Sequence, residues 1–181
     1  SKFRSRLSIS RQLNKTTWLD TIYISKYLNE RLNFSYVKSI NDHWSAGGST
    51  TMLASSYNNY DLSIKIMPGI EYDIFPYSQS TRHQLRLLYN AGLEISNYSD
   101  TTTRFKVKET LAYHSLSASL SVIQKWGSVS STLAWSNYFF DWKYNNLSLN
   151  SDATLRIVKG LTFSIDGSVA LVHDQVSLPK G

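Results

Sequence analysis

The sequence predicts an all-β protein built as an antiparallel up-and-down meander, because three observations agree. Apolar and polar residues alternate without interruption from residue 60 to residue 74, and an extended backbone turns successive side chains to opposite faces. Similar alternation recurs along the chain between short polar turns. Tyrosine occurs 12 times and tryptophan 5 times, as is typical of strands, whereas runs of glutamate and alanine are few. We therefore expect about ten or more strands in a single domain that covers residues 1–181.

The first half of the chain contains five expected strands, which cover residues 3–13, 18–28, 32–40, 44–56 and 60–74. Polar turns at residues 14–17 and 41–43 separate the earlier strands. The facing of the second strand stays open, because its odd and its even positions are both partly apolar. The fifth strand is the most regular, and Tyr60 belongs with Leu62 and Ile64 on its apolar side.

The second half follows a proline turn at residues 75–80, and its expected strands cover residues 84–95, 115–122, 129–139, 147–157 and 161–171. The turns near residues 125 and 159 are tight, whereas the segments 97–111 and 140–146 are longer and polar. Short turns on one rim and longer loops on the other are typical of a membrane barrel.

The composition of the two strand faces favours a membrane barrel over a sheet in bulk water. The polar face carries mostly serine, threonine, asparagine, alanine and glycine, which suit a crowded wet interior. The mean hydropathy of −0.29 is low, and no run approaches the roughly 20 apolar residues of a membrane helix. In a barrel only every second residue meets lipid, so a low average is expected there too.

The fold class that we predict is therefore a transmembrane β-barrel with lipid outside and water within. The residues expected to face lipid are Leu62, Ile64, Ile66, Ile70, Leu85, Leu87, Leu93, Leu120, Leu133, Leu155, Phe163 and Ile165. The polar residues expected to face the lumen are Asp61, Lys65, Glu71, Asp73, Arg86, Glu94, Asp152, Arg156 and Asp166.

Aromatic residues gather near the expected strand ends, where amphipathic rings prefer the headgroup level of a membrane. The residues expected at the rim with the tight turns are Trp18, Trp44, Phe75, Tyr77 and Trp126. Those expected to form the opposite belt are Trp135, Tyr138, Phe139, Phe140 and Trp142. The alternative is that these rings end strands and cover a soluble core.

Other classes of function have weak support in the sequence. The formal charge of +6 comes from dispersed basic residues, so we expect no nucleic-acid binding. Cysteine is absent, which excludes disulfides and thiolate metal sites. His114 and the serines at 115 and 117 lie on opposite faces of one strand, and the pair Glu71 and Asp73 is more simply lumen charge than a glycosidase pair. We expect no catalytic residues, no metal site and no cofactor.

Four stretches, His43 to Gly47, Glu71 to Arg82, Trp126 to Ser130 and Asp174 to Gly181, resemble a family of uncharacterised outer-membrane β-barrel proteins of diderm (Gram-negative type) bacteria. The similarity spans residues 32–181, and the proline turn is its most specific part. It implies an outer-membrane barrel without an assigned substrate or reaction. Related barrels end in a strand with a terminal aromatic residue, and this chain begins without a signal peptide, so we expect an excerpt truncated at both ends.

These observations together predict a non-enzymatic integral protein of the cell outer membrane, acting as a scaffold or as a narrow, porin-like passive pore. Its expected partner is outer-membrane lipid, with other membrane or surface proteins as further candidates. The rival prediction is a soluble β-barrel or sandwich that binds an apolar ligand in its interior. In that case the apolar sides through Ile64, Leu87 and Phe163 would point inward to a pocket.

Overall fold

A computed structural model describes the backbone of residues 2–18, 21–76 and 81–180, together with the side chains of residues 6, 8–10, 28–76 and 81–180. The strands are β1 (Lys2–Trp18), β2 (Thr21–Ser39), β3 (Trp44–Ser55), β4 (Tyr60–Asp73), β5 (His83–Tyr98), β6 (Lys108–Gln124), β7 (Gly127–Tyr138), β8 (Asp141–Val158) and β9 (Leu161–Val172). Every strand in this list pairs with its neighbours in the chain, in the order β1 to β9. All eight pairings are antiparallel, so the predicted all-β meander is confirmed.

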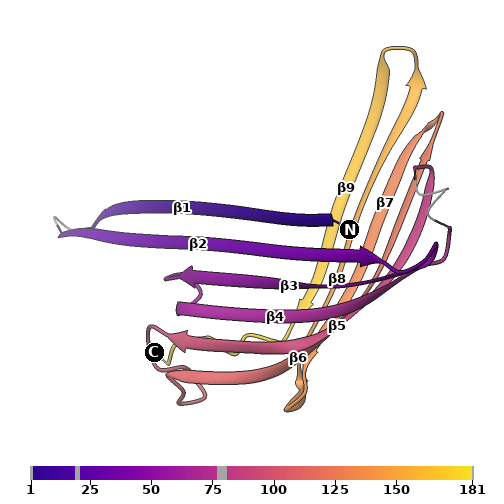
Figure 1. Ribbon diagram of the computed structural model, residues 1–181. Helices are drawn as coiled ribbons and strands as arrows, with labels where there is room; N and C mark the ends of the chain where they lie inside the picture. Colours follow the sequence, from indigo (N-terminus) through magenta and orange to yellow (C-terminus); the bar gives the residue numbers. More distant parts are fainter. Residues whose placement is uncertain (1, 19–20, 77–80, 181) are drawn as a thin grey trace.

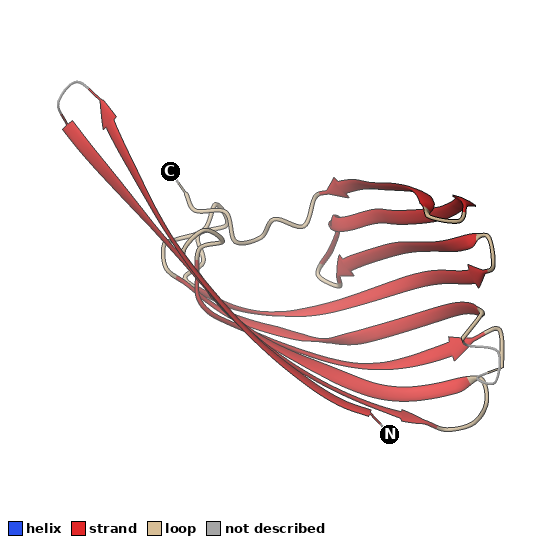
Figure 2. Ribbon diagram, turned by 90° about the horizontal axis from the view of Figure 1, so that it is seen from above, coloured by secondary structure: helices blue, strands red, loops and turns tan. Residues whose placement is uncertain are grey.

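The sheet is strongly twisted and curved (Figure 1). Strands β1 to β6 lie across the view, whereas β7, β8 and β9 stand upright beside them. A large rotation of this kind is expected when the right-handed twist between neighbouring strands accumulates over a wide sheet. The curvature gives the sheet a concave and a convex face (Figure 2).

The described residues form nine strands in place of about ten, because the boundaries near the start were predicted wrongly. The expected turn at residues 14–17 lies inside β1, and the expected strands 18–28 and 32–40 are one continuous strand, β2. The register explains the difference, since β2 is paired with β1 from Thr21 to Val37 and the polar residues 29–31 do not interrupt the pairing. Residues 21–27 pair only with β1, so the end of this hairpin projects beyond β3 (Figure 1).

The connections lie at two rims, which we name after a tryptophan at each. The Trp44 rim carries residues 40–43, 74–76, 81–82, 125–126 and 159–160. The Trp142 rim carries residues 56–59, 99–107, 139–140 and the segment after β9. The expected loop at 140–146 is wrong, because β8 begins at Asp141. The two longest connections, 74–82 and 99–107, lie on opposite rims, so the predicted difference in loop length between the rims is also wrong.

The sheet is not closed in this structure, and β1 and β9 are its two edges. Because the number of strands is odd and all pairings are antiparallel, these two edge strands run in the same direction. Direct pairing of β1 with β9 would therefore be parallel, whereas closure by antiparallel pairs alone requires an even number of strands.

At two positions the backbone geometry explains why the residue is glycine. Gly160 has a φ of 90° in the two-residue turn between β8 and β9, a conformation that favours glycine. Gly47 pairs with Gly69 in the middle of the sheet, and a Cβ atom built on Gly47 would overlap the carbonyl oxygen of Tyr36. A side chain at position 47 would therefore clash with the backbone of β2.

Candidate functional site

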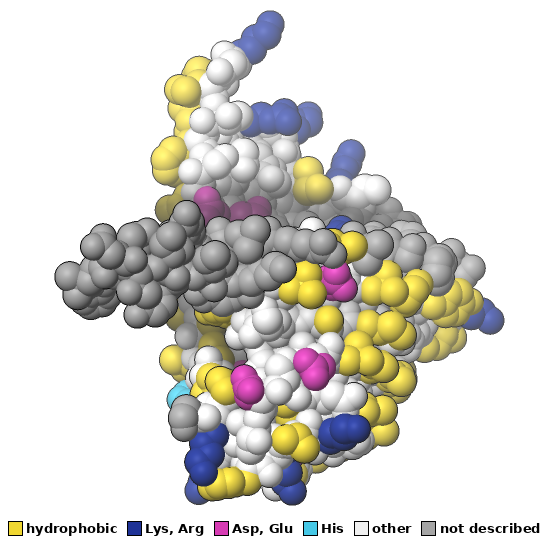
Figure 3. All heavy atoms as spheres, turned by 90° about the vertical axis from the view of Figure 1, so that its left-hand side faces the viewer, with side chains coloured by type: hydrophobic (Ala, Val, Ile, Leu, Met, Phe, Trp, Pro, Cys, Tyr) yellow, Lys and Arg dark blue, Asp and Glu magenta, His cyan; other side chains and the backbone are white. Residues whose placement is uncertain are grey.

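The convex face is apolar and exposed. The hydrophobic side chains that alternate along the strands project from it, and none of the residues predicted to face lipid is buried. The exposed ones are Leu62, Ile66, Ile70, Leu87, Leu93, Leu133, Phe163 and Ile165, and the half-buried ones are Ile64, Leu85, Leu120 and Leu155. Hydrophobic side chains gather along a flank of the molecule beside a mostly polar region (Figure 3).

Little apolar surface is buried elsewhere. Among the described side chains, the buried hydrophobic residues are Met67, Tyr98, Leu111, Tyr138 and Val176. A soluble protein of this length would normally enclose a much larger apolar core. Among the described residues, the apolar side chains therefore lie mainly on the outside of the sheet. Exposed apolar patches mark sites of contact with proteins, ligands or membranes.

The concave face holds a buried polar cluster around Glu94, which is only 4% exposed. One carboxylate oxygen accepts a hydrogen bond of 2.7 Å from the Tyr138 hydroxyl and forms an ion pair of 3.0 Å with Lys65. The other oxygen accepts a bond of 3.2 Å from Ser63. The Lys65 ammonium also lies 4.0 Å from the centre of the Tyr113 ring. Every charge in this cluster has a partner, so the cluster joins β4, β5, β6 and β7 on the concave side.

A β-bulge between Tyr60 and Leu62 changes the facing at the start of β4. Tyr60 was expected on the apolar side with Leu62, but its hydroxyl donates a hydrogen bond of 3.3 Å to Glu94 on the concave face. Asp61, which was expected in the lumen, is exposed at the Trp142 rim and accepts a bond of 2.7 Å from Ser99. The uninterrupted alternation in the sequence gave no sign of this bulge.

A second charged group lies on the concave face toward the Trp44 rim. Arg86 forms an ion pair of 3.6 Å with Glu71, and it is the register partner of Asp73 across the β4–β5 pairing. Asp73 is buried, and one of its carboxylate oxygens has no hydrogen-bond partner among the described residues. Apart from Asp61, the predicted lumen residues of β4 and β5 therefore come together as two clusters, one near each rim.

The predicted lumen residues of β8 and β9 do not join these clusters. Asp152, Arg156 and Asp166 are exposed, and none of them forms an ion pair with another described residue. Asp152 lies directly opposite Asp166 in the register, and like charges in this position repel each other. The open edge of the sheet leaves these charges without an opposing wall.

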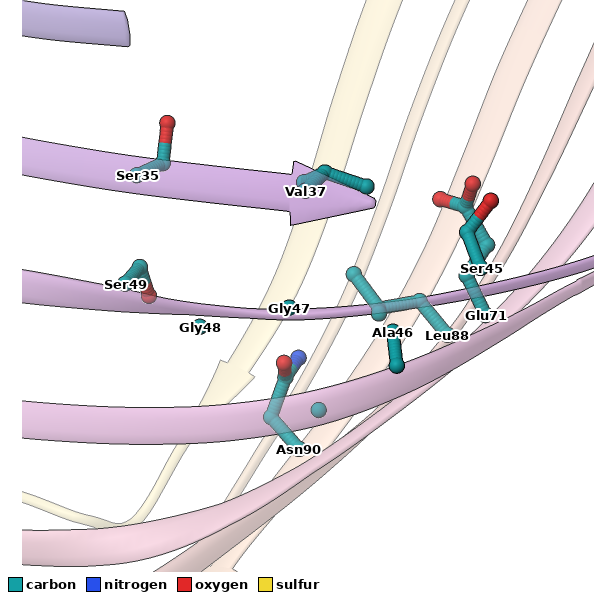
Figure 4. Close-up of a pocket in the computed structure, with 11 residues that line it drawn as sticks. Ser35, Val37, Ser45, Ala46, Gly47, Gly48, Ser49, Glu71, Leu88 and Asn90 are labelled. Carbon is teal, nitrogen blue, oxygen red and sulfur yellow. The ribbon is translucent and has the colours of Figure 1, made fainter. Parts of the chain in front are cut away.

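A hollow of about 200 Å³ lies on the concave face between the two clusters, where β2, β3, β4 and β5 run side by side (Figure 4). Its walls include Ser35, Ser49, Glu71 and Asn90, and its floor includes Gly47. Its lining mixes these polar side chains with glycines and with the apolar Val37, Ala46 and Leu88, so the hollow has room for water or a small solute.

The segment after β9 crosses the concave side at the Trp142 rim (Figure 2). Val176, only 2% exposed, packs in a cluster with Leu111 and Tyr138. Asn59, in the β3–β4 turn, donates a hydrogen bond of 2.9 Å to the carbonyl oxygen of Ser177, and Thr103 donates one of 2.8 Å to that of Leu178. The docking of this segment across the sheet has no periodic signal in the sequence.

The aromatic residues occupy both rims. Trp44 and Trp126 are exposed at the Trp44 rim, Phe75 is half-buried there, and Trp135 and Trp142 lie toward the Trp142 rim. Two placements differ from the prediction. The backbone of Trp18 ends β1 at the Trp142 rim, opposite the expected side, and its side chain lies outside the described residues, as does Tyr77. Tyr138 belongs to the buried concave cluster and not to an aromatic belt.

His114 lies on the apolar face under a group of rings. It is 6% exposed, stacks on Phe139 with 4.3 Å between ring centres, and meets Trp135 edge-on at 5.0 Å. Its Nδ1 is 3.4 Å from the Tyr89 hydroxyl, and its Nε2 is buried without a partner in the described structure. The polar contact that the structure shows for this imidazole is the Tyr89 hydroxyl, and its other described neighbours are mainly aromatic rings.

The remaining histidines form local contacts. His43 Nδ1 donates a hydrogen bond of 2.7 Å to the carbonyl oxygen of Asp73, and His83 lies 3.0 Å from the Gln124 amide. Within the described part of the chain, no three histidine, aspartate or glutamate side chains lie close enough together to hold a metal ion.

Comparison with known protein families, with curated proteins and with solved structures gave no match to this chain. The resemblance to outer-membrane β-barrel proteins therefore stays a prediction. No helix among the described residues is long and apolar enough to cross a membrane.

Proposed function

We propose that this chain forms the wall of a non-enzymatic outer-membrane β-barrel that acts as a membrane scaffold or a narrow passive pore. The observation that carries the proposal is the distribution of apolar surface: an exposed apolar convex face extends over the strands while few hydrophobic side chains are buried. Lipid is the phase that stabilises such a face. The strands are 12 to 19 residues long, which exceeds the roughly 9 to 11 residues of a tilted membrane strand, so their ends project beyond the bilayer.

The aromatic residues at both rims support the same orientation. Trp44 and Trp126 at one rim, and Trp135 and Trp142 at the other, lie at the levels where headgroups would meet the protein. A soluble barrel with an apolar pocket is less well supported, because Leu87 and Phe163, which that function would turn inward, are exposed on the convex face.

Closure of the proposed barrel needs more than these nine strands if all its pairs are antiparallel. The unpaired edges of β1 and β9 are the places where further strands would add. The segment after β9 and the Glu94 cluster occupy the concave side at the Trp142 rim, so a pore would be narrowest there. This arrangement favours small solutes or a scaffold role.

Membrane insertion is tested by flotation of the full chain with lipid vesicles after a urea wash. We expect the protein to float with the vesicles and to require detergent for extraction. Recovery as a monodisperse protein in the aqueous fraction without detergent would overturn the proposal. Single-channel current in a planar bilayer then separates the two roles, since a folded but silent barrel is a scaffold.

A further inference from the structure

The convex face carries a groove of about 290 Å³ whose lining is almost entirely apolar. It is formed by Ile70, Leu87, Tyr89 and Leu116, with Trp44 and Tyr72 at one end. The register places Trp44, Tyr72 and Leu87 in one row across β3, β4 and β5. Ile70, Tyr89 and Leu116 form the next row, farther from the Trp44 rim. The groove therefore leads from the rim toward the middle of the apolar face.

A polar pocket of about 420 Å³ adjoins this groove at the β2–β3 turn. It is lined by Asn41, Asp42 and His43, and it shares Trp44 and Tyr72 with the groove. The Asn41 side chain fixes the turn, because its oxygen accepts hydrogen bonds of 2.9 Å and 2.8 Å from the backbone amides of His43 and Trp44. The order from the rim inward is thus polar turn, aromatic pair and apolar groove.

The charge and the rings of the polar pocket indicate the headgroup that it would accept. The Asp42 carboxylate is exposed and forms no ion pair with another described residue. The centres of the Trp44 and Tyr72 rings lie 4.8 Å apart, with 50° between the ring planes. The His43 ring also stacks on Tyr72, with 5.8 Å between the ring centres. A carboxylate beside aromatic rings attracts an ammonium group and repels an anion.

We propose that the pocket and the groove together bind one lipid with an ammonium headgroup. The ammonium lies beside Asp42 and the rings of Trp44 and Tyr72, and an acyl chain lies in the groove between Leu87 and Ile70. The inference rests on the proposed membrane function, because the Trp44 rim then lies at the headgroup level and the groove extends into hydrocarbon. Strands tilted by about 45° also let a chain along the membrane normal cross several strands, as this groove does.

The test uses the full chain in detergent micelles, titrated with phosphatidylethanolamine or with phosphatidylglycerol of the same acyl chains, with bound lipid counted by native mass spectrometry. We expect one phosphatidylethanolamine to be retained and phosphatidylglycerol to bind about tenfold more weakly. Asp42→Asn removes the charge and lowers phosphatidylethanolamine binding about tenfold. Leu87→Trp fills the groove and lowers the binding of both lipids by about the same factor.

The matched controls are Asp141→Asn at the Trp142 rim and Val169→Trp on the convex side of β9, and both should bind lipid as the unaltered chain does. Equal binding of the two lipids would overturn the headgroup assignment, and unchanged binding by Leu87→Trp would overturn the groove. Circular dichroism checks that each variant keeps its β-sheet. Flotation is measured on the same samples: a chain that does not float but still retains phosphatidylethanolamine would refute membrane residence and leave the lipid site standing.

Discussion

Substitution of Glu94 by glutamine should destabilise the protein, because this carboxylate is the centre of the concave cluster. Its oxygens accept hydrogen bonds from Tyr138 at 2.7 Å and Ser63 at 3.2 Å, and it pairs with Lys65 at 3.0 Å. Glutamine keeps the shape of the side chain but removes its charge. Its amide nitrogen is a donor, and it would face groups such as the Tyr138 hydroxyl and the Lys65 ammonium, which donate to Glu94. Breaking a fully buried ion pair costs roughly 3 to 5 kcal/mol. The Lys65 side chain is 29% exposed, so water recovers part of this cost and we expect a loss of about 2 to 3 kcal/mol.

The measurement is equilibrium urea unfolding of the detergent-refolded protein, followed by tryptophan fluorescence. Glu71→Gln is the matched control, because Glu71 has a longer contact of 3.6 Å with Arg86, whose side chain is 41% exposed. We expect the control to lose less than about 1 kcal/mol. In a double-mutant cycle with Lys65→Met, the losses should be non-additive. A Glu94→Gln protein as stable as the unaltered chain would refute the structural role given to this cluster.

Three further predictions follow from individual side chains. Ile66→Arg places a charge in the middle of a strand on the convex face, where Ile66 is 48% exposed. In lipid it should lower the free energy of unfolding by about 2 to 4 kcal/mol, whereas Ile157→Arg near the Trp44 rim should lower it by about 0 to 1 kcal/mol. Equal small effects of the two substitutions on unfolding in vesicles would contradict the lipid-facing assignment. Val176→Ala removes two buried methyl groups and should lower the free energy of unfolding by about 1.6 kcal/mol. Proteolysis of the segment after β9 should also become faster. Resistance to the protease equal to that of the unaltered chain would show that this contact does not hold the segment. His114→Phe removes a buried nitrogen, Nε2, that has no partner in the described structure, so the free energy of unfolding should stay the same or rise by up to about 1 kcal/mol. A marked loss of stability in thermal unfolding would show that Nε2 has a partner.

The strand pattern was predictable from sequence wherever pairing is regular. The alternation of Leu85, Leu87 and Leu93 with polar residues matches the observed β5, and the same reasoning placed β7 and β9 within a few residues. It failed at residues 14–17 and 29–31, where polar residues stay in strands because a neighbouring strand supplies backbone hydrogen bonds, β2 for the first segment and both β1 and β3 for the second. Local polarity cannot report a pairing partner that lies elsewhere in the chain.

The candidate site was predictable only by type. Lys65 and Glu94 were both expected on the wet face, yet their pairing across β4 and β5 depends on the register. Tyr60 was placed on the wrong side because a one-residue bulge reverses facing without changing the residue pattern. The polar pocket beside Trp44 was not predicted at all, since it forms only when the register of β3 and β4 brings Tyr72 beside the turn at residues 41–43.

The sequence by itself determined an all-β meander with one apolar and one polar face, because successive side chains of a strand point to opposite faces. The tertiary structure alone decided that the apolar face is convex and uncovered, and that the two edge strands of the nine-stranded sheet run in the same direction. It also decided that the chain folds back over its own polar face through Val176. Those features depend on twist, register and long-range contacts, which are cooperative properties of the assembled sheet.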